Sequence, residues 1–204
     1  MQPQTFVFFG QVGSGKGTQV KLLTDFLKNK DGLETIYAGT GEGFRQLIES
    51  DNYTASLVKE YMDRGELVPD FLTNAIFTNI LISNLSPEKN LIADGYPRTV
   101  MQSMSFEKKM EFYKRKNIKI IYIELDREEA MKRNLLRGRH DDTEAGLFKR
   151  FEEYKNNVIP AMNYFKDKEN YKIYTINGEQ IIEDVHKDII KALGRSDSES
   201  LQTR

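Results

Sequence analysis

The sequence predicts an α/β fold in which a five-stranded parallel sheet lies between two layers of helices. Short apolar runs alternate along the chain with longer segments of helical periodicity. The run Ile120–Ile123 is continuously apolar, which is typical of a strand buried on both faces. Because alternating strands and helices form βαβ units, we expect a three-layer α/β/α sandwich.

Each expected strand is a short apolar run, and each expected helix is a longer stretch with apolar positions on one face. The strands are Thr5–Phe9, Thr35–Ala38, Asn90–Ala93, Ile118–Leu125 and Lys172–Ile176. The helices are Lys16–Asn29, Glu42–Glu49, Thr54–Arg64, Asp70–Asn84, Thr99–Lys114, Arg127–Leu136, Thr143–Phe165 and Gln180–Leu193. In the first helix, Val20, Leu23 and Leu27 supply the apolar face. Phosphate ligands bind at the carboxyl ends of such strands, so we expect the functional site there.

The composition excludes several classes of protein. A chain of 204 residues with 39% hydrophobic and 30% charged residues suits one compact domain with insertions. A net charge of −1 argues against a dedicated nucleic-acid binder. The absence of cysteine rules out disulfides and cysteine-bound zinc. No apolar run approaches the roughly 20 residues of a membrane span, and the first apolar run is too short for a signal peptide. We therefore expect a cytoplasmic protein that binds neither nucleic acid nor membrane.

A glycine-rich loop follows the first expected strand and precedes the first expected helix. Gly10–Thr18 reads Gly-Gln-Val-Gly-Ser-Gly-Lys-Gly-Thr, which fits the G-x-x-x-x-G-K spacing of a P-loop. Glycines let successive backbone N–H groups face one anion, and the helix N-terminus adds positive potential. Lys16 supplies a mobile charge for the outer phosphates. A hydroxyl residue usually follows this lysine in a P-loop, but Gly17 stands there and Thr18 comes next. The Gly-Lys-Gly-Thr pattern favours kinases of small nucleotides over other nucleotide-binding proteins. The fold is therefore expected to be that of the P-loop NTPases.

A second group of candidate residues follows the third expected strand. Asp94 ends this strand, the usual position of a carboxylate that holds the water shell of Mg²⁺ near a P-loop. Gly95 and Pro97 predict a tight turn that aims Arg98 from the strand end, and a guanidinium suits phosphate. Arg45, after a glycine-rich stretch, is a further candidate.

These motifs resemble those of the adenylate kinases, in the nucleoside monophosphate kinase family, over about residues 5 to 193. The resemblance implies reversible transfer of a phosphoryl group from ATP to AMP, giving two ADP. It implies that the donor phosphates are held by Gly10, Gly13, Ser14, Gly15, Lys16, Gly17 and Thr18. It implies an AMP site formed by Thr40, Gly41, Arg45, Val68, Gly95, Arg98, Gln102, Arg139 and Arg150, with Gln102 on the adenine.

The resemblance extends to the later part of the chain. It implies that Arg133 lies against the ATP base, with Gln180 in the stretch that borders it. Arg137, Arg139 and Arg150 would contact the phosphates, so the implied catalytic residues are Lys16, Arg98, Arg137, Arg139 and Arg150. Mg²⁺ would be held mainly through phosphates and water, with Thr18 and Asp94 behind the water shell. No zinc is implied, and we expect a monomer.

The expected organisation is a P-loop core with two insertions. The core comprises residues 1–38, 69–136 and 147–194. Residues 39–68 form a helical AMP-binding insertion, residues 137–146 form a very short lid, and residues 195–204 form a disordered tail. Flaps at these places would exclude water during phosphoryl transfer.

The chain departs from the family pattern at several positions. Val12 stands where the family has proline, and Gly39 stands where serine is usual. Glu42 replaces the usual aspartate, and Gly43 is an unusual residue for a helix. The lid is shorter than in other short-lid members.

Three other functions are weighed against this one. A kinase of UMP or CMP is the nearest alternative, although Gln102 favours adenine because an amide both donates and accepts at one base edge. A GTP-binding switch would need Asn-Lys-x-Asp, which the sequence lacks. A nucleotide-binding protein without turnover is disfavoured by the arginine set.

Overall fold

The computed structural model describes residues 2–137 and 143–195. Its sheet has five parallel strands in the order β2-β3-β1-β4-β5. The strands are β1 (Thr5–Phe9), β2 (Thr35–Gly39), β3 (Asn90–Asp94), β4 (Ile118–Glu124) and β5 (Tyr171–Asn177). The predicted α/β fold with a five-stranded parallel sheet is therefore confirmed.

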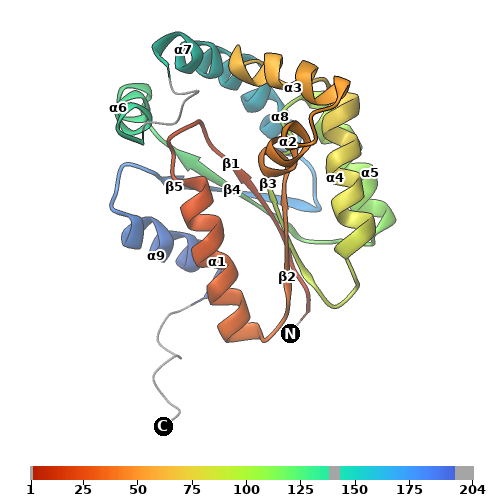
Figure 1. Ribbon diagram of the computed structural model, residues 1–204. Helices are drawn as coiled ribbons and strands as arrows, with labels where there is room; N and C mark the ends of the chain where they lie inside the picture. The colour runs from red at the N-terminus through yellow and green to blue at the C-terminus, as the bar shows by residue number, and fades with distance from the viewer. Residues whose placement is uncertain (1, 138–142, 196–204) are drawn as a thin grey trace.

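Helices cover both faces of this sheet (Figure 1). They are α1 (Lys16–Asp31), α2 (Thr40–Glu49), α3 (Tyr53–Asp63), α4 (Asp70–Asn84), α5 (Val100–Phe112), α6 (Arg127–Arg137), α7 (Glu144–Glu153), α8 (Ile159–Asn163) and α9 (Ile182–Ala192). Phe6 and Phe8 of β1 pack with α1 and α9, whereas Val7 and Phe9 pack with α4, α5 and α8. Successive strand residues point to opposite faces, so one apolar strand supplies both halves of the core.

The expected helix over residues 143–165 is interrupted, and this prediction is wrong in detail. A π-helical turn, η1 (Tyr154–Val158), separates α7 from α8. Pro160 lies at the start of α8, where its missing N–H removes a hydrogen bond from the helical ladder. A helix that meets this proline must adjust its backbone hydrogen bonding nearby, and a π-turn is one such adjustment.

Helices α2 and α3 have an apolar cluster of their own. Phe44, Val58 and Val68 are its buried members, and Ile76 of α4 packs against it. Gly43 of α2 is explained by this packing, because a Cβ there would lie 2.6 Å from the Ile76 side chain. Glycine in a helix costs about 1 kcal/mol relative to alanine, but here it allows two helices to approach closely.

Arg195, the first residue of the expected tail, is bonded to the folded domain. The Arg195 guanidinium makes a two-pronged ion pair with the Asp31 carboxylate, with N–O distances of 2.8 and 3.0 Å. The Asp31 side chain is fully buried, and only 15% of the Arg195 side chain is exposed. Arg195 is therefore bonded to the C-terminal end of α1. The rest of the tail lies outside the described residues.

We expect Arg195→Ala to lower the free energy of unfolding by about 2–3 kcal/mol, because it leaves the Asp31 carboxylate buried without its partner. The measurement is denaturant unfolding of the two chains. Lys108→Ala is the control, since its ion pair with Glu111 is exposed and should contribute nothing measurable. Equal effects of the two substitutions would contradict a structural role for Arg195.

Candidate active site

A cleft of about 750 Å³ opens at the carboxyl ends of the central strands. Residues from β1, β2 and β3, the glycine loop, helices α1 to α7 and the π-helical turn η1 line it. Most of the predicted site residues line this cleft: Gly10, Gly13, Gly15, Lys16, Gly17, Thr18, Thr40, Gly41, Arg45, Val68, Asp94, Gly95, Arg98, Gln102, Arg133 and Arg150. Segments far apart in the sequence therefore meet at one place, as the sequence predicts.

The glycine loop needs its glycines for close contacts as well as for backbone conformation. Gly10, Gly13 and Gly15 all have positive φ, which side chains other than glycine rarely adopt. A Cβ on Gly10 would lie 2.7 Å from the carbonyl oxygen of Ile123. A Cβ on Gly13 would lie 2.4 Å from the Asn134 amide nitrogen on α6. The loop is thus fitted between β4 and α6.

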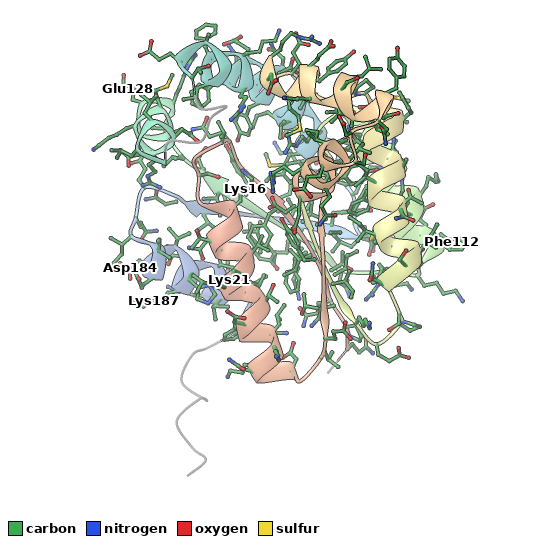
Figure 2. The ribbon with its side chains drawn as sticks, viewed as in Figure 1. Lys16, Lys21, Phe112, Glu128, Asp184 and Lys187 are labelled. Atoms are coloured by element: carbon green, nitrogen blue, oxygen red, sulfur yellow. The ribbon has the colours of Figure 1, made fainter. Side chains whose placement is uncertain are left out.

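Lys16 is the first residue of α1 and lies next to the glycine loop (Figure 2). Its Nζ donates to the carbonyl oxygens of Gly10, at 2.6 Å, and Gln11, at 3.0 Å, and lies 3.5 Å from the Ser14 hydroxyl. Ser14 is buried and does not line the cleft. The positive end of α1 and the lysine ammonium therefore act at one site, which suits an anion.

Gln11 is a site residue that the sequence analysis missed. Its buried side-chain amide donates to the carbonyl oxygens of Leu125, at 2.6 Å, and Asp126, at 3.1 Å. These bonds tie the glycine loop to the end of β4. Val12, at the position where the family has proline, packs against the apolar cluster of Leu125 and Leu147. A glutamine in a loop is usually solvated, so the sequence alone gives no signal of this role.

Tyr37 explains the unusual glycine at position 39. The two residues lie on the same face of β2, and a Cβ on Gly39 would lie 2.3 Å from the Tyr37 hydroxyl oxygen. The glycine leaves room for the Tyr37 ring, whose hydroxyl donates to the Asp94 carboxylate at 3.2 Å. Burial and the negative charge of Asp94 raise the pKa of Tyr37 well above its ordinary value.

Arg98 is fixed by the turn that follows β3. Its Nε donates to the Gly95 carbonyl oxygen at 2.8 Å, and the Thr40 hydroxyl donates to the same oxygen at 2.8 Å. Burial lowers the pKa of Arg98, the nearby Asp94 carboxylate opposes this effect, and the positive charge of Arg150 adds to it. Two guanidinium groups therefore repel each other across the cleft, an arrangement that an anion between them would relieve.

Gln102 is almost fully buried, with 1% of its surface exposed, and both ends of its amide are bonded within the protein. Its carbonyl oxygen accepts from the Arg98 backbone N–H at 2.8 Å, and its Nε2 donates to the Asp70 carboxylate at 2.8 Å. The sequence predicts that Gln102 contacts the adenine of AMP. The structure shows that the Arg98 N–H and the Asp70 carboxylate also bind its side chain.

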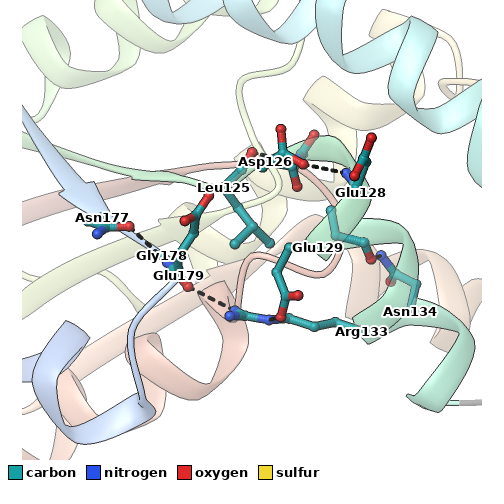
Figure 3. A network of polar contacts seen from close by, with 11 residues as sticks. Leu125, Asp126, Glu128, Glu129, Arg133, Asn134, Asn177, Gly178 and Glu179 are labelled. Carbon is teal, nitrogen blue, oxygen red and sulfur yellow. Dashed lines mark hydrogen bonds and ion pairs between the residues drawn. The ribbon is translucent and has the colours of Figure 1, made fainter.

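Arg133 lines the cleft from α6 and bridges to the loop after β5 (Figure 3). Its Nε donates to the Glu129 carboxylate at 2.7 Å, and its Nη1 donates to the Gly178 carbonyl oxygen at 2.8 Å. Gln180 is not among the residues that line the cleft. Its amide instead donates to Asn177 and Asp188, within the loop and to α9.

The side chains of two predicted site residues are not described. Arg139 lies outside the described residues, and Arg137 is described only as the last residue of α6. Among the described residues, no group of acidic or histidine side chains forms a ready-made metal site. In the same part of the chain, no helix is both long enough and apolar enough to cross a membrane.

The sheet order, the glycine loop and the converging charges define a P-loop protein of the nucleotide kinase class. Residues 8–170 match the family model for adenylate kinase. The chain is 30% identical over 188 residues to adenylate kinase 1 of Nostoc sp., covering 92% of this chain and 97% of that protein. It is 35% identical over 161 residues to an adenylate kinase of Prochlorococcus marinus, covering 79% of this chain and 84% of that protein.

The chain therefore belongs to the adenylate kinase family. It is a nucleoside monophosphate kinase with adenylate kinase activity, as the sequence predicts.

We expect Gly39→Ser to displace the Tyr37 ring and break its hydrogen bond to Asp94. The phenolate of Tyr37 is disfavoured by burial and by Asp94, so removing both influences lowers the Tyr37 pKa toward the ordinary value of about 10. Alkaline spectrophotometric titration measures this change. In a Tyr37→Phe background the same serine substitution should leave the titration unchanged. A curve for Gly39→Ser that overlays the wild-type curve would refute the packing explanation.

Proposed function

We propose that the cleft joins ATP and AMP end to end and transfers the terminal phosphoryl group between them. The observation that carries this proposal is the convergence on one cleft of Lys16 from α1, Arg98 from the turn after β3, and Arg150 from α7. The reaction brings together two polyanions with roughly six negative charges, so positioning and charge stabilisation are its main requirements.

The donor half of the cleft is assigned to the glycine loop and α1. The backbone N–H groups of residues 10–18 and the Lys16 ammonium bind the ATP phosphates. Gln11 ties the loop to the end of β4 and Asn134 lies close against Gly13, so the loop N–H groups need little reorganisation when phosphate arrives. Arg133 and the loop after β5 border the adenine of ATP. Gln180 supports that loop through its bonds to Asn177 and Asp188.

The acceptor half is assigned to the ends of β2 and β3 with α2 and α5. Arg45 and Arg98 bind the AMP phosphate, and Gln102 contacts the adenine. Thr40, Gly41, Val68 and Gly95 complete this wall of the cleft. Thr40 is bonded to the Gly95 carbonyl oxygen, which links the two strand ends behind the phosphate-binding arginine.

The chemistry needs no strong general base, because the attacking phosphate oxygen of AMP is already anionic at neutral pH. Lys16, Arg98 and Arg150 stabilise the charge that spreads over the transferred group, at a few kcal/mol for each well-placed donor. Arg137 and Arg139 are proposed to add to this set from the lid.

Mg²⁺ fits the residues present, although they form no all-protein cage. Thr18 and Asp94 line the cleft beside the donor site and suit water bound to the ion rather than the ion itself. When bound, Mg²⁺ offsets about two of the phosphate charges. Tyr37 holds the Asp94 carboxylate by its hydrogen bond.

The organisation of the protein follows the same proposal. Residues 39–68 are proposed as the AMP-binding insertion and residues 137–146 as a short lid that limits the entry of water. The apolar cluster of α2 and α3, which also contacts Leu72 and Ile76 of α4, supports the first assignment, since these two helices pack with each other apart from the sheet. The protein is proposed to act as a monomer in the cytoplasm.

A coupled assay of ADP formation tests the proposal directly. We expect turnover of MgATP with AMP and far slower loss of ATP without it. CMP and UMP serve as competing acceptors, and faster turnover with either would favour the alternative pyrimidine kinase. Turnover that does not depend on any monophosphate would contradict the proposal.

We expect Arg98→Ala to lower kcat/KM by about 10²–10³-fold with little change in Tm, because Arg98 lines the cleft and its Nε bond to the Gly95 carbonyl oxygen stays within one turn. Arg115→Ala is the matched contrast. Arg115 donates to the carbonyl oxygens of Ser86 and Lys89, away from the cleft, so its loss should lower Tm and spare kcat/KM. A large fall in Tm for Arg98→Ala would mark Arg98 as structural.

A further inference from the structure

Asp70, the first residue of α4, joins three parts of the acceptor half of the cleft. One of its carboxylate oxygens accepts from the Gln102 side-chain Nε2 at 2.8 Å, and the other accepts from the Thr99 hydroxyl at 2.8 Å. The Thr99 oxygen in turn accepts from the Gln102 backbone N–H at 3.1 Å. Asp70 therefore binds the Gln102 side chain directly, and it also binds Thr99, the residue that caps the start of α5.

These contacts decide which way the Gln102 amide points. A carboxylate can only accept hydrogen bonds, and a backbone N–H can only donate. The Gln102 nitrogen must therefore face Asp70, and its oxygen must face the Arg98 N–H. A flipped amide would place oxygen against carboxylate and nitrogen against N–H, in a side chain with only 1% exposure. Burial makes such unpaired groups costly, so the orientation is fixed.

A fixed amide can distinguish purines that have nearly the same shape. Each end of the Gln102 amide keeps one further hydrogen-bonding position, an N–H and an oxygen lone pair. Adenine offers an amino donor beside a ring-nitrogen acceptor, which matches this pattern. Hypoxanthine offers an oxo acceptor beside a ring N–H donor, which is the reverse. An amide free to flip would serve both bases equally.

We infer that Asp70 is a positioning residue that locks the Gln102 amide in the orientation that accepts adenine and rejects 6-oxopurines. The inference rests on the proposed role of Gln102 as the reader of the acceptor base. Asp70 itself need not touch the nucleotide. It selects the base by adding to the Arg98 N–H a second contact that favours the same orientation of the Gln102 amide.

Asp70 also has a structural role that the test must separate from this one. It is the acidic residue in the first turn of α4, where a negative charge stabilises the helix. Loss of that effect alone would lower stability and affect AMP and inosine monophosphate (IMP) alike. Selectivity between these two acceptors is therefore the readout that a purely structural role leaves unchanged.

The experiment measures kcat/KM for AMP and for IMP with Asp70→Asn, which keeps the side-chain shape but can donate as well as accept. We expect the ratio of AMP to IMP to fall by about tenfold or more, through a higher KM for AMP and a lower KM for IMP. kcat with AMP and the KM for ATP should change little. Should Asp70→Asn fail to fold, Asp70→Ala removes the acceptor of the Gln102 Nε2 and should shift the ratio in the same direction.

Two further variants test whether Asp70 acts through Gln102. In a Gln102→Ala background, Asp70→Asn should produce no additional change in the ratio. Glu183→Gln is the matched control, because it removes a first-turn acid from α9 and should leave the ratio at the wild-type value. Tm values for all variants separate loss of fold from loss of selectivity.

The outcomes distinguish this inference from the proposed function. If Gln102→Ala abolishes the preference for AMP while Asp70→Asn retains it, the inference fails and the role of Gln102 stands. A change caused by Asp70→Asn that persists without Gln102 also overturns the inference. If Gln102→Ala keeps full preference for AMP, Gln102 is not the reader and both fail.

Discussion

The register of the parallel sheet is the constraint on which the rest of the structure depends. Phe8 of β1 and Gly39 of β2 both pair with Asp94 of β3, so these three strands end at one edge. The glycine loop, the start of α2 and the Arg98 turn then leave the sheet together. A slip of one residue would turn every side chain of a strand to the other face and separate these groups.

Convergence of charge at that edge has an energetic cost in the protein without ligand. Burial and the positive charge of Arg150 both lower the pKa of Arg98, so the cleft without ligand disfavours the charge on this side chain. A polyanion in the cleft reverses this effect, and its binding stabilises the folded state by mass action. The same geometry therefore selects phosphate ligands.

The sequence predicts what depends on local pattern. Continuous apolar runs predict the five strands, and glycine spacing predicts the loop with Lys16. The sequence could not predict contacts that join distant segments, such as the bond of Gln11 to Leu125, 114 residues away. The contact between Tyr37 and Gly39 could have been suspected from the sequence, because the unusual Gly39 shares a strand face with Tyr37. The π-turn and the bond of Asp70 to Gln102 depend on packing between helices, which periodicity within one helix does not reveal.

The most direct test of a single phosphate-binding cleft is a crystal structure with two adenosines joined by five phosphates. The account predicts that the phosphate chain crosses the cleft, with Lys16, Arg98 and Arg150 at hydrogen-bond distances of about 3 Å from its oxygens. It also predicts one adenine against Arg133 and the other against Gln102. A phosphate chain bound elsewhere, with these three cations turned toward solvent, would contradict it.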